Sequence, residues 1–154
     1  MAAAPTPAAQ LAAFVSRFDS RVAAVMRGAR TRVRRMIPTA NELVYDNYNF
    51  FVIGYSTTQR PSDCIVSLAA SAKGVVLSFY YGVGLPDPKR LLLGEGNQNR
   101  FIRLESPSTL ERPAVRALIR AATARAKTPL AKAGRGVLVI RSISAKQRPR
   151  RQPR

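Results

Sequence analysis

The stretch that decides the fold is residues 75–104, which read VVLSFYYGVGLPDPKRLLLGEGNQNRFIRL. Its first seven residues are apolar at almost every position, which predicts a central strand covered on at least one face. Two prolines then flank Asp87 and prevent regular helix or strand at that point. Residues 101–104 alternate in polarity, as expected for a short return strand whose successive side chains point to opposite faces.

The residues before this stretch indicate one helix followed by strands. Apolar residues recur at three- and four-residue spacing over residues 10–36, which predicts an amphipathic helix that Pro38 ends. Gly28 weakens this helix by about 1 kcal/mol relative to Ala. Residues 41–56 predict one strand with a bulge, or two strands joined by a turn, at Asp46-Asn47. Residues 64–72 predict another strand, which lies close enough to residue 75 to form an antiparallel hairpin.

The residues after this stretch predict a helix region that opens at Pro107 and a final strand over residues 137–144. A run of strands bracketed by helices is typical of the α+β class. We therefore expect a two-layer sandwich, in which an antiparallel sheet of about five strands carries the N-terminal and C-terminal helices on one face. Residues 10–145 would form a single domain, with a disordered lead at 1–9 and a basic disordered tail at 146–154.

The composition excludes several classes of site. The 154 residues contain no histidine, which removes Ser-His-Asp triads, Cys-His pairs and zinc sites built on histidine. No nucleophile–base pair is found, so we expect a protein that is not an enzyme and needs no cofactor. Cys64 is the one cysteine, which favours a reducing, cytoplasmic location and a small buried apolar role. No apolar run reaches the roughly 18 residues of a membrane span.

The positive charge is concentrated at the two ends of the chain. The net charge is +18, yet residues 37–111 carry six basic and seven acidic side chains, whereas residues 112–154 carry thirteen basic side chains and no acidic one. This distribution is typical of proteins that bind nucleic acid or another polyanion. The candidate residues are Arg116, Arg120, Arg141, Arg148, Arg150 and Arg151. The alternative is a solvated basic surface produced by GC-rich coding, since Arg outnumbers Lys 21 to 5.

Several short motifs lie in the charge-neutral middle of the chain. They include Asp46-Asn47-Tyr48-Asn49, the strand leading to Gly82, and a loop built on Leu85, Pro86, Asp87, Pro88, Gly94, Glu95 and Gly96, followed by Arg100. In these motifs the chain resembles the YdhG-like family of small domains of unknown function, over roughly residues 37–150. The resemblance implies a frataxin-like α/β sandwich, and some relatives are similar to intracellular iron chaperones.

The resemblance makes iron or metal binding the alternative function, with Asp46, Asp87 and Glu95 as candidate ligands. Hard cations need several converging oxygen atoms, and the first predicted helix offers one aspartate among seven arginines. Asp87 is typical of a side chain that accepts hydrogen bonds from a turn backbone. Glu95 and Arg100 are placed to pair across the glycine turn. A small-molecule site in this loop stays open as a further hypothesis.

Overall fold

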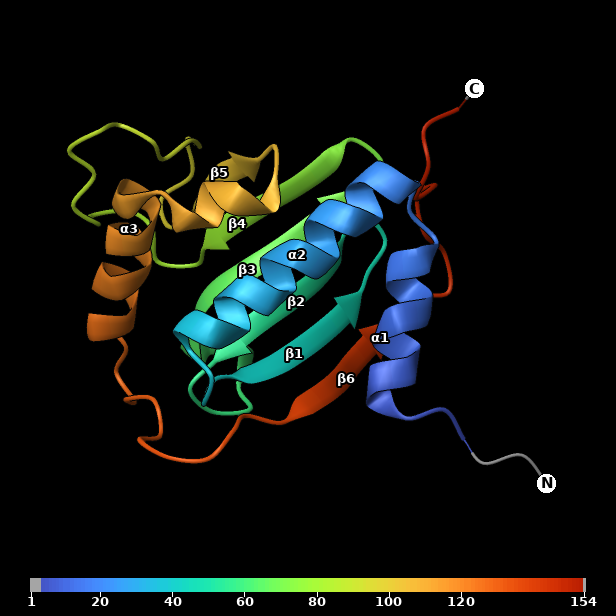
Figure 1. Cartoon of the computed structure of the whole chain (residues 1–154), viewed down its shortest axis with the longest axis horizontal. Helices are drawn as coiled ribbons and strands as arrows, with labels where there is room; N and C mark the ends of the chain where they lie inside the picture. Colours follow the sequence, from blue (N-terminus) through green and yellow to red (C-terminus); the bar gives the residue numbers. More distant parts are fainter. Residues whose placement is uncertain (1–3, 154) are drawn as a thin grey trace.

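The computed structural model describes residues 4–153 and has an α+β architecture, which confirms the expected class. In that range, no helix has the length and apolar character needed to cross a bilayer. The elements, shown in Figure 1, are α1 Pro7–Ser16, α2 Ser20–Met36, β1 Asn41–Asp46, β2 Phe51–Ser56, η1 Pro61–Asp63, β3 Cys64–Ser71, β4 Gly74–Phe79, β5 Arg100–Leu104, η2 Pro107–Glu111, α3 Pro113–Ala124 and β6 Leu138–Ile143.

The sheet has six strands in the order β5-β4-β3-β2-β1-β6. Neighbouring strands are antiparallel except β6, which pairs with β1 in parallel. The expectation of an antiparallel sheet of about five strands is therefore met in part: β1 to β5 pair antiparallel, and β6 adds a sixth strand in parallel. The reason is the connection after α3, which carries the chain back to the far edge of the sheet and brings β6 alongside β1 in the same direction (Figure 1).

The two faces of the sheet differ because side chains alternate along every strand. One row crosses the helix-covered face from β1 to β5, and all its members are buried: Val44, Ile53, Leu68, Leu77 and Ile102. Helix α2 runs across this face, with α1 and α3 on either side of it (Figure 1). The apolar residues of the three helices pack against this row and form one core with it. Helix periodicity and strand alternation therefore point the apolar side chains into the same core.

The N-terminal helix is two helices, so the expectation of one helix over residues 10–36 is wrong. Helix α1 begins at Pro7, inside the expected disordered lead, with Thr6 as its cap; residues 1–3 lie outside the described range. Asp19 starts α2 by accepting a 3.0 Å hydrogen bond from the backbone N–H of Val22. Between the helices, Phe18 is buried and its ring packs on that of Phe51.

The C-terminal tail packs on the domain over its described residues. Arg150 is only 4% exposed and donates a 2.8 Å hydrogen bond to Asp46 Oδ1. Gln147 Nε2 donates to the carbonyl of the same Asp46. Because buried Asp46 needs cationic partners, it fixes a segment whose composition predicts disorder. Arg154 lies outside the described residues.

Candidate functional site

The six candidate polyanion residues do not form one surface. Arg116 and Arg120 are exposed on α3, at one end of the sheet (Figure 1). Arg141 lies on β6, and the tail with Arg148, Arg150 and Arg151 follows it at the opposite end. The structure therefore gives two separate basic regions rather than one.

At the tail end, the arginines hold the chain in place. Arg148 Nε donates a 2.9 Å hydrogen bond to Asn49 Oδ1, and its guanidinium lies 5.5 Å from the ring centre of Tyr48. Arg151 Nε donates to the carbonyl of Arg17. Arg150 is buried against Asp46. These three side chains have structural partners already, which makes this end the weaker candidate for binding a phosphate.

Three of the eight carboxylates, Glu42, Asp46 and Glu111, pair with arginines of the N-terminal helix region. Arg30 forms a bidentate pair with Glu42 at 2.8 and 2.9 Å, and this hydrogen bonding raises the pKa of Arg30. Glu42 also accepts a hydrogen bond from the buried Tyr55 hydroxyl. The other ion pairs in residues 4–153 join Arg17 and Arg150 to Asp46, Arg32 to Glu111, Arg34 to Glu42, and Arg60 to Asp63.

The cations of α3 and the turn after it are exposed and uncompensated. Within residues 4–153, none of their side chains forms an ion pair or a hydrogen bond. Four-residue spacing places three of them along one side of the helix, while Val115, Leu118 and Ile119 face the core. We call this the α3 basic surface; it consists of Arg112, Arg116, Arg120, Arg125 and Lys127.

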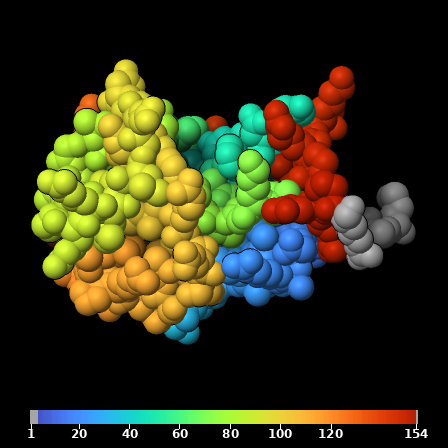
Figure 2. All heavy atoms as spheres, turned by 90° about the horizontal axis from the view of Figure 1, so that it is seen from above, coloured from blue at the N-terminus to red at the C-terminus, as the bar shows by residue number. Residues whose placement is uncertain are grey.

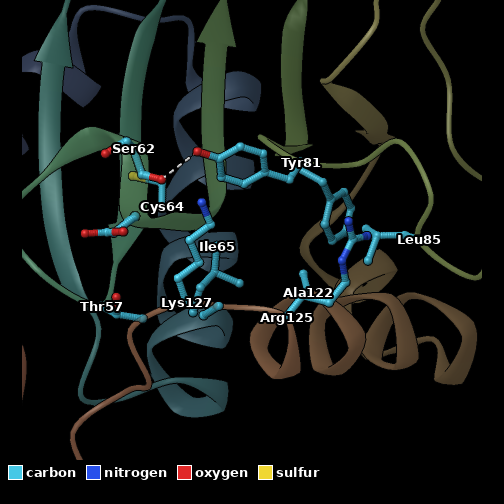
Figure 3. A pocket seen from close by; sticks show the side chains of 12 residues that line it. Thr57, Ser62, Cys64, Ile65, Tyr81, Leu85, Ala122, Arg125 and Lys127 are labelled. Carbon is cyan, nitrogen blue, oxygen red and sulfur yellow. Dashed lines mark hydrogen bonds between the residues drawn. The ribbon is translucent and has the colours of Figure 1, made fainter.

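A pocket of about 190 Å³ opens at the C-terminal end of this surface (Figure 3). We call it the α3 pocket. It is lined from β3 by Cys64 and Ile65, from β4 and the following loop by Phe79, Tyr81 and Leu85, from the β2–β3 connection by Thr57, Ser62 and Asp63, and from the α3 region by Ala122, Arg125, Ala126 and Lys127. The Tyr81 hydroxyl donates a 2.9 Å hydrogen bond to the Ser62 carbonyl, which ties two walls together.

The Cys64 thiol in this pocket is not an activated nucleophile. Burial, together with the nearby Asp63 charge, raises the pKa of Cys64 to about 11. A thiol attacks as its thiolate, so this group is neutral and unreactive at physiological pH. The structure confirms the prediction that Cys64 is a small buried residue.

A second groove of about 450 Å³ lies between the β3–β4 hairpin, the start of α2 and the end of β5; Figure 2 shows the molecule hollowed between the yellow lobe and the red tail. Its lining includes Arg21, Lys73 and Arg103, but also Asp19 and Glu105. Because both signs of charge line this groove, it discriminates less in favour of an anion than the α3 basic surface does.

The loop that carries the family resemblance is explained by turn chemistry. Asp87 accepts hydrogen bonds from the backbone N–H groups of Leu91 and Leu92 at 2.8 and 2.9 Å, as its position between prolines predicts. Arg100 donates to the carbonyls of Gly96 and Asn99, so the expected Glu95–Arg100 pair is wrong. Leu85 is buried and is the one residue of the Leu-Pro-Asp-Pro motif that lines the α3 pocket.

The three candidate metal ligands have separate environments. Asp46 is buried and forms ion pairs with Arg17 and Arg150. The Asp87 carboxylate accepts hydrogen bonds from the backbone of its own turn, and Glu95 is exposed. Within the part of the chain that the structure describes, no three His, Cys, Asp or Glu residues gather in a way that could hold a metal ion. The geometry of these residues therefore lends no support to the iron alternative.

Sequence reasoning missed the α3 pocket. Arg125 and Lys127 extend the charge pattern of α3 and could have been included on that ground. The apolar walls come from β3, β4 and the loop after β4, and no local pattern brings these segments together.

No family model, curated protein or solved structure matches the chain.

Proposed function

We propose that this protein is a non-enzymatic binding module whose α3 basic surface holds a polyanion, with nucleic acid as the favoured class. The observation that supports the proposal is the contrast in charge compensation. Four arginines on or next to the N-terminal helices, Arg17, Arg30, Arg32 and Arg34, have carboxylate partners, whereas none of the five cations clustered on the α3 basic surface has one in residues 4–153.

Coding bias alone does not favour this arrangement. Like charges at four-residue spacing, such as Arg112, Arg116 and Arg120, destabilise a helix by roughly 0.2–0.5 kcal/mol per pair. The cost is relieved when phosphates lie between the guanidinium groups. The tail arginines Arg148, Arg150 and Arg151 have structural partners, whereas those of the α3 basic surface have none in residues 4–153.

The binding mode follows from the kind of contact. Arginine and lysine side chains on a helix surface reach phosphates, and phosphate contacts position a ligand without reading its sequence. Affinity should therefore be nearly independent of base sequence and should fall steeply with salt, since each neutralised phosphate releases counterions. The proposal includes a cytoplasmic location, which the lone buried thiol supports. It also includes membership of the YdhG-like family and a frataxin-like topology, which the α+β architecture supports.

The test compares two variants that lose the same charge at opposite ends. Fluorescence anisotropy would follow the binding of labelled 20-nucleotide single-stranded and duplex DNA and RNA of random sequence, between 25 and 200 mM salt. For Arg116→Ala/Arg120→Ala, we expect the slope of log affinity against log salt to shrink by about 2.

The matched control is Arg141→Ala/Lys146→Ala, which removes two exposed charges near the tail. We expect this variant to bind almost as tightly as the parent protein. Equal losses in the two variants would mean that only the net charge matters. Absence of binding at 25 mM salt would refute the proposal altogether.

A further inference from the structure

We propose that the α3 pocket is a binding site for a small organic acid, that is, a compact apolar body carrying one carboxylate or phosphate group. The pocket shares Arg125 and Lys127 with the α3 basic surface but differs from it in what it recognises, because the apolar part of the ligand would be enclosed. It therefore does not depend on the function proposed above.

The size of the pocket restricts the ligand. Its volume of about 190 Å³ is smaller than the roughly 300–1,000 Å³ of pockets that bind drug-sized molecules. A single ring or a short branched chain fits such a space, and a dinucleotide or a long acyl chain does not.

The inner wall of the pocket is apolar. Ile65, Phe79 and Leu85 are buried, and Ala122 from α3 lines the same space (Figure 3). The raised pKa of Cys64 keeps the thiol neutral, so it adds to this apolar wall. Apolar surface that a ligand buries here contributes about 25 cal/mol per Å².

The cations lie at the opening. In Figure 3, the Lys127 side chain extends into the pocket toward Tyr81, and the Arg125 guanidinium lies beside Leu85. Neither forms an ion pair in residues 4–153, although the charge of Lys127 helps to lower the pKa of Asp63. The Thr57 hydroxyl, also in the lining, is buried without a hydrogen-bond partner and is a free donor.

Asp63 is the one acidic group in the lining, and its charge is compensated. Its Oδ2 accepts a 2.8 Å hydrogen bond from the Thr58 hydroxyl and lies 3.1 Å from Arg60. These contacts lower the pKa of Asp63. The carboxylate is thus paired with Arg60, and Arg125 and Lys127 give the opening a net positive charge.

Isothermal titration calorimetry with four small probes tests the site. Benzoate and phenyl phosphate carry the two candidate anionic groups on the same ring, benzyl alcohol lacks the charge, and inorganic phosphate lacks the ring. We expect one or both aryl anions to bind at least tenfold more tightly than either control. Similar binding of benzyl alcohol, or of inorganic phosphate, would overturn the proposal.

Three variants locate the binding. Arg125→Gln and Lys127→Gln should each weaken binding of the aryl anion by roughly tenfold, as expected for the loss of a charged hydrogen bond. Ala122→Phe should block the pocket and abolish binding. Arg112→Gln, at the other end of α3, is the matched control and should have no effect.

The outcomes separate this proposal from the function proposed above. Ala122→Phe should leave binding of nucleic acid intact, and Arg116→Ala/Arg120→Ala should leave binding of the aryl anion intact. If Ala122→Phe fails to fold by circular dichroism, the exposed Arg125 and Lys127 variants still decide the matter. Unchanged affinity in both of these variants would refute the site.

Discussion

At the scale of single residues, Gly28 shows how a tertiary contact can require glycine inside a helix, where glycine is otherwise unfavourable. A Cβ atom at this position would lie 2.5 Å from Pro107 Cγ, so only glycine lets η2 pack directly on α2. The sequence alone suggests that Gly28 merely weakens the helix. Its contact with a segment 79 positions later in the chain gives it a packing role.

Replacing Gly28 with Ala should lower the stability, although Ala is the better helix former. The gain in helix propensity is about 1 kcal/mol, whereas overpacking against a rigid proline ring costs about 1–3 kcal/mol. Thermal unfolding followed by circular dichroism should show a lower Tm for Gly28→Ala. Thr31→Ala, at an exposed position of the same helix, should show an unchanged or higher Tm. A rise in Tm for Gly28→Ala would contradict the packing of η2.

The buried thiol of Cys64 should make stability depend on alkaline pH. Its folded pKa of about 11 lies above the value in the unfolded chain, so its contribution is complete below about pH 8.5 and is lost as pH rises towards 11. Urea unfolding from pH 8 to 11 should show the parent protein losing roughly 2–3 kcal/mol more than Cys64→Ala. The pKa of Tyr55 is also raised, by burial, but Tyr55 is present in both proteins. Parallel curves would contradict the assigned environment of the thiol.

At the scale of secondary-structure elements, one carboxylate joins three segments of the chain. Asp46, at the end of β1, is 1% exposed and contacts Arg17 after α1 and Arg150 in the tail. The Arg150 guanidinium also lies 5.8 Å from the ring centre of Phe18. The tail therefore closes over the junction between α1 and α2 and stabilises the sheet edge next to β6.

Loss of Arg150 should destabilise the whole domain. Removal of one partner from a buried ion pair costs about 3–5 kcal/mol, because the remaining charge is left uncompensated. Arg17, which is about half exposed, compensates part of that loss, so we expect about 3 kcal/mol for Arg150→Ala in urea unfolding. Arg148→Ala, which breaks an exposed contact, should cost less than about 1 kcal/mol. If Asp46→Asn/Arg150→Ala is as unstable as the sum of the single variants, the two residues are not coupled.

Local patterns predicted most of the elements but not the contacts between distant ones. Alternation and turn residues placed β3, β4 and β5 to within about two residues. Helical spacing does not predict the break between α1 and α2, because apolar residues continue at that spacing through Phe18. The position of the tail depends on Asp46, which is 104 positions from Arg150. The direction of β6 depends on the long connection after α3. The ridge of Arg116 and Arg120 follows from helical spacing, whereas the α3 pocket needs segments that only the folded chain brings together.

At the scale of the whole molecule, the basic side chains of the described residues fall into those with carboxylate partners and those without. The carboxylates on β1 face the helices, where Arg30 and Arg17 meet them. At the α3 end, Asp63 pairs with Arg60 and Glu111 pairs with Arg32, so repulsion among the unpaired cations of the α3 basic surface opposes the folded state. Folding and binding are therefore coupled through the same charges.

Salt and polyanions should both raise the Tm, but by different amounts in different variants. Salt at 0.1 M screens exposed charges beyond about 10 Å, which reduces the repulsion. A bound polyanion adds stabilisation by mass action. Scanning calorimetry with 20-nucleotide DNA at low salt should give a clear rise in Tm for the parent protein and a smaller one for Arg116→Ala/Arg120→Ala. An equal rise in both would place the ligand away from α3.

The parallel pairing of β6 with β1 has a consequence for biosynthesis. Strand β1 leaves the ribosome roughly 5–20 seconds before β6, since chains grow by about 5–20 residues per second. During that interval, the outer edge of β1 has unpaired backbone groups that can recruit a strand from another chain. Premature termination before residue 138 should therefore yield a product that aggregates rather than a slightly smaller domain.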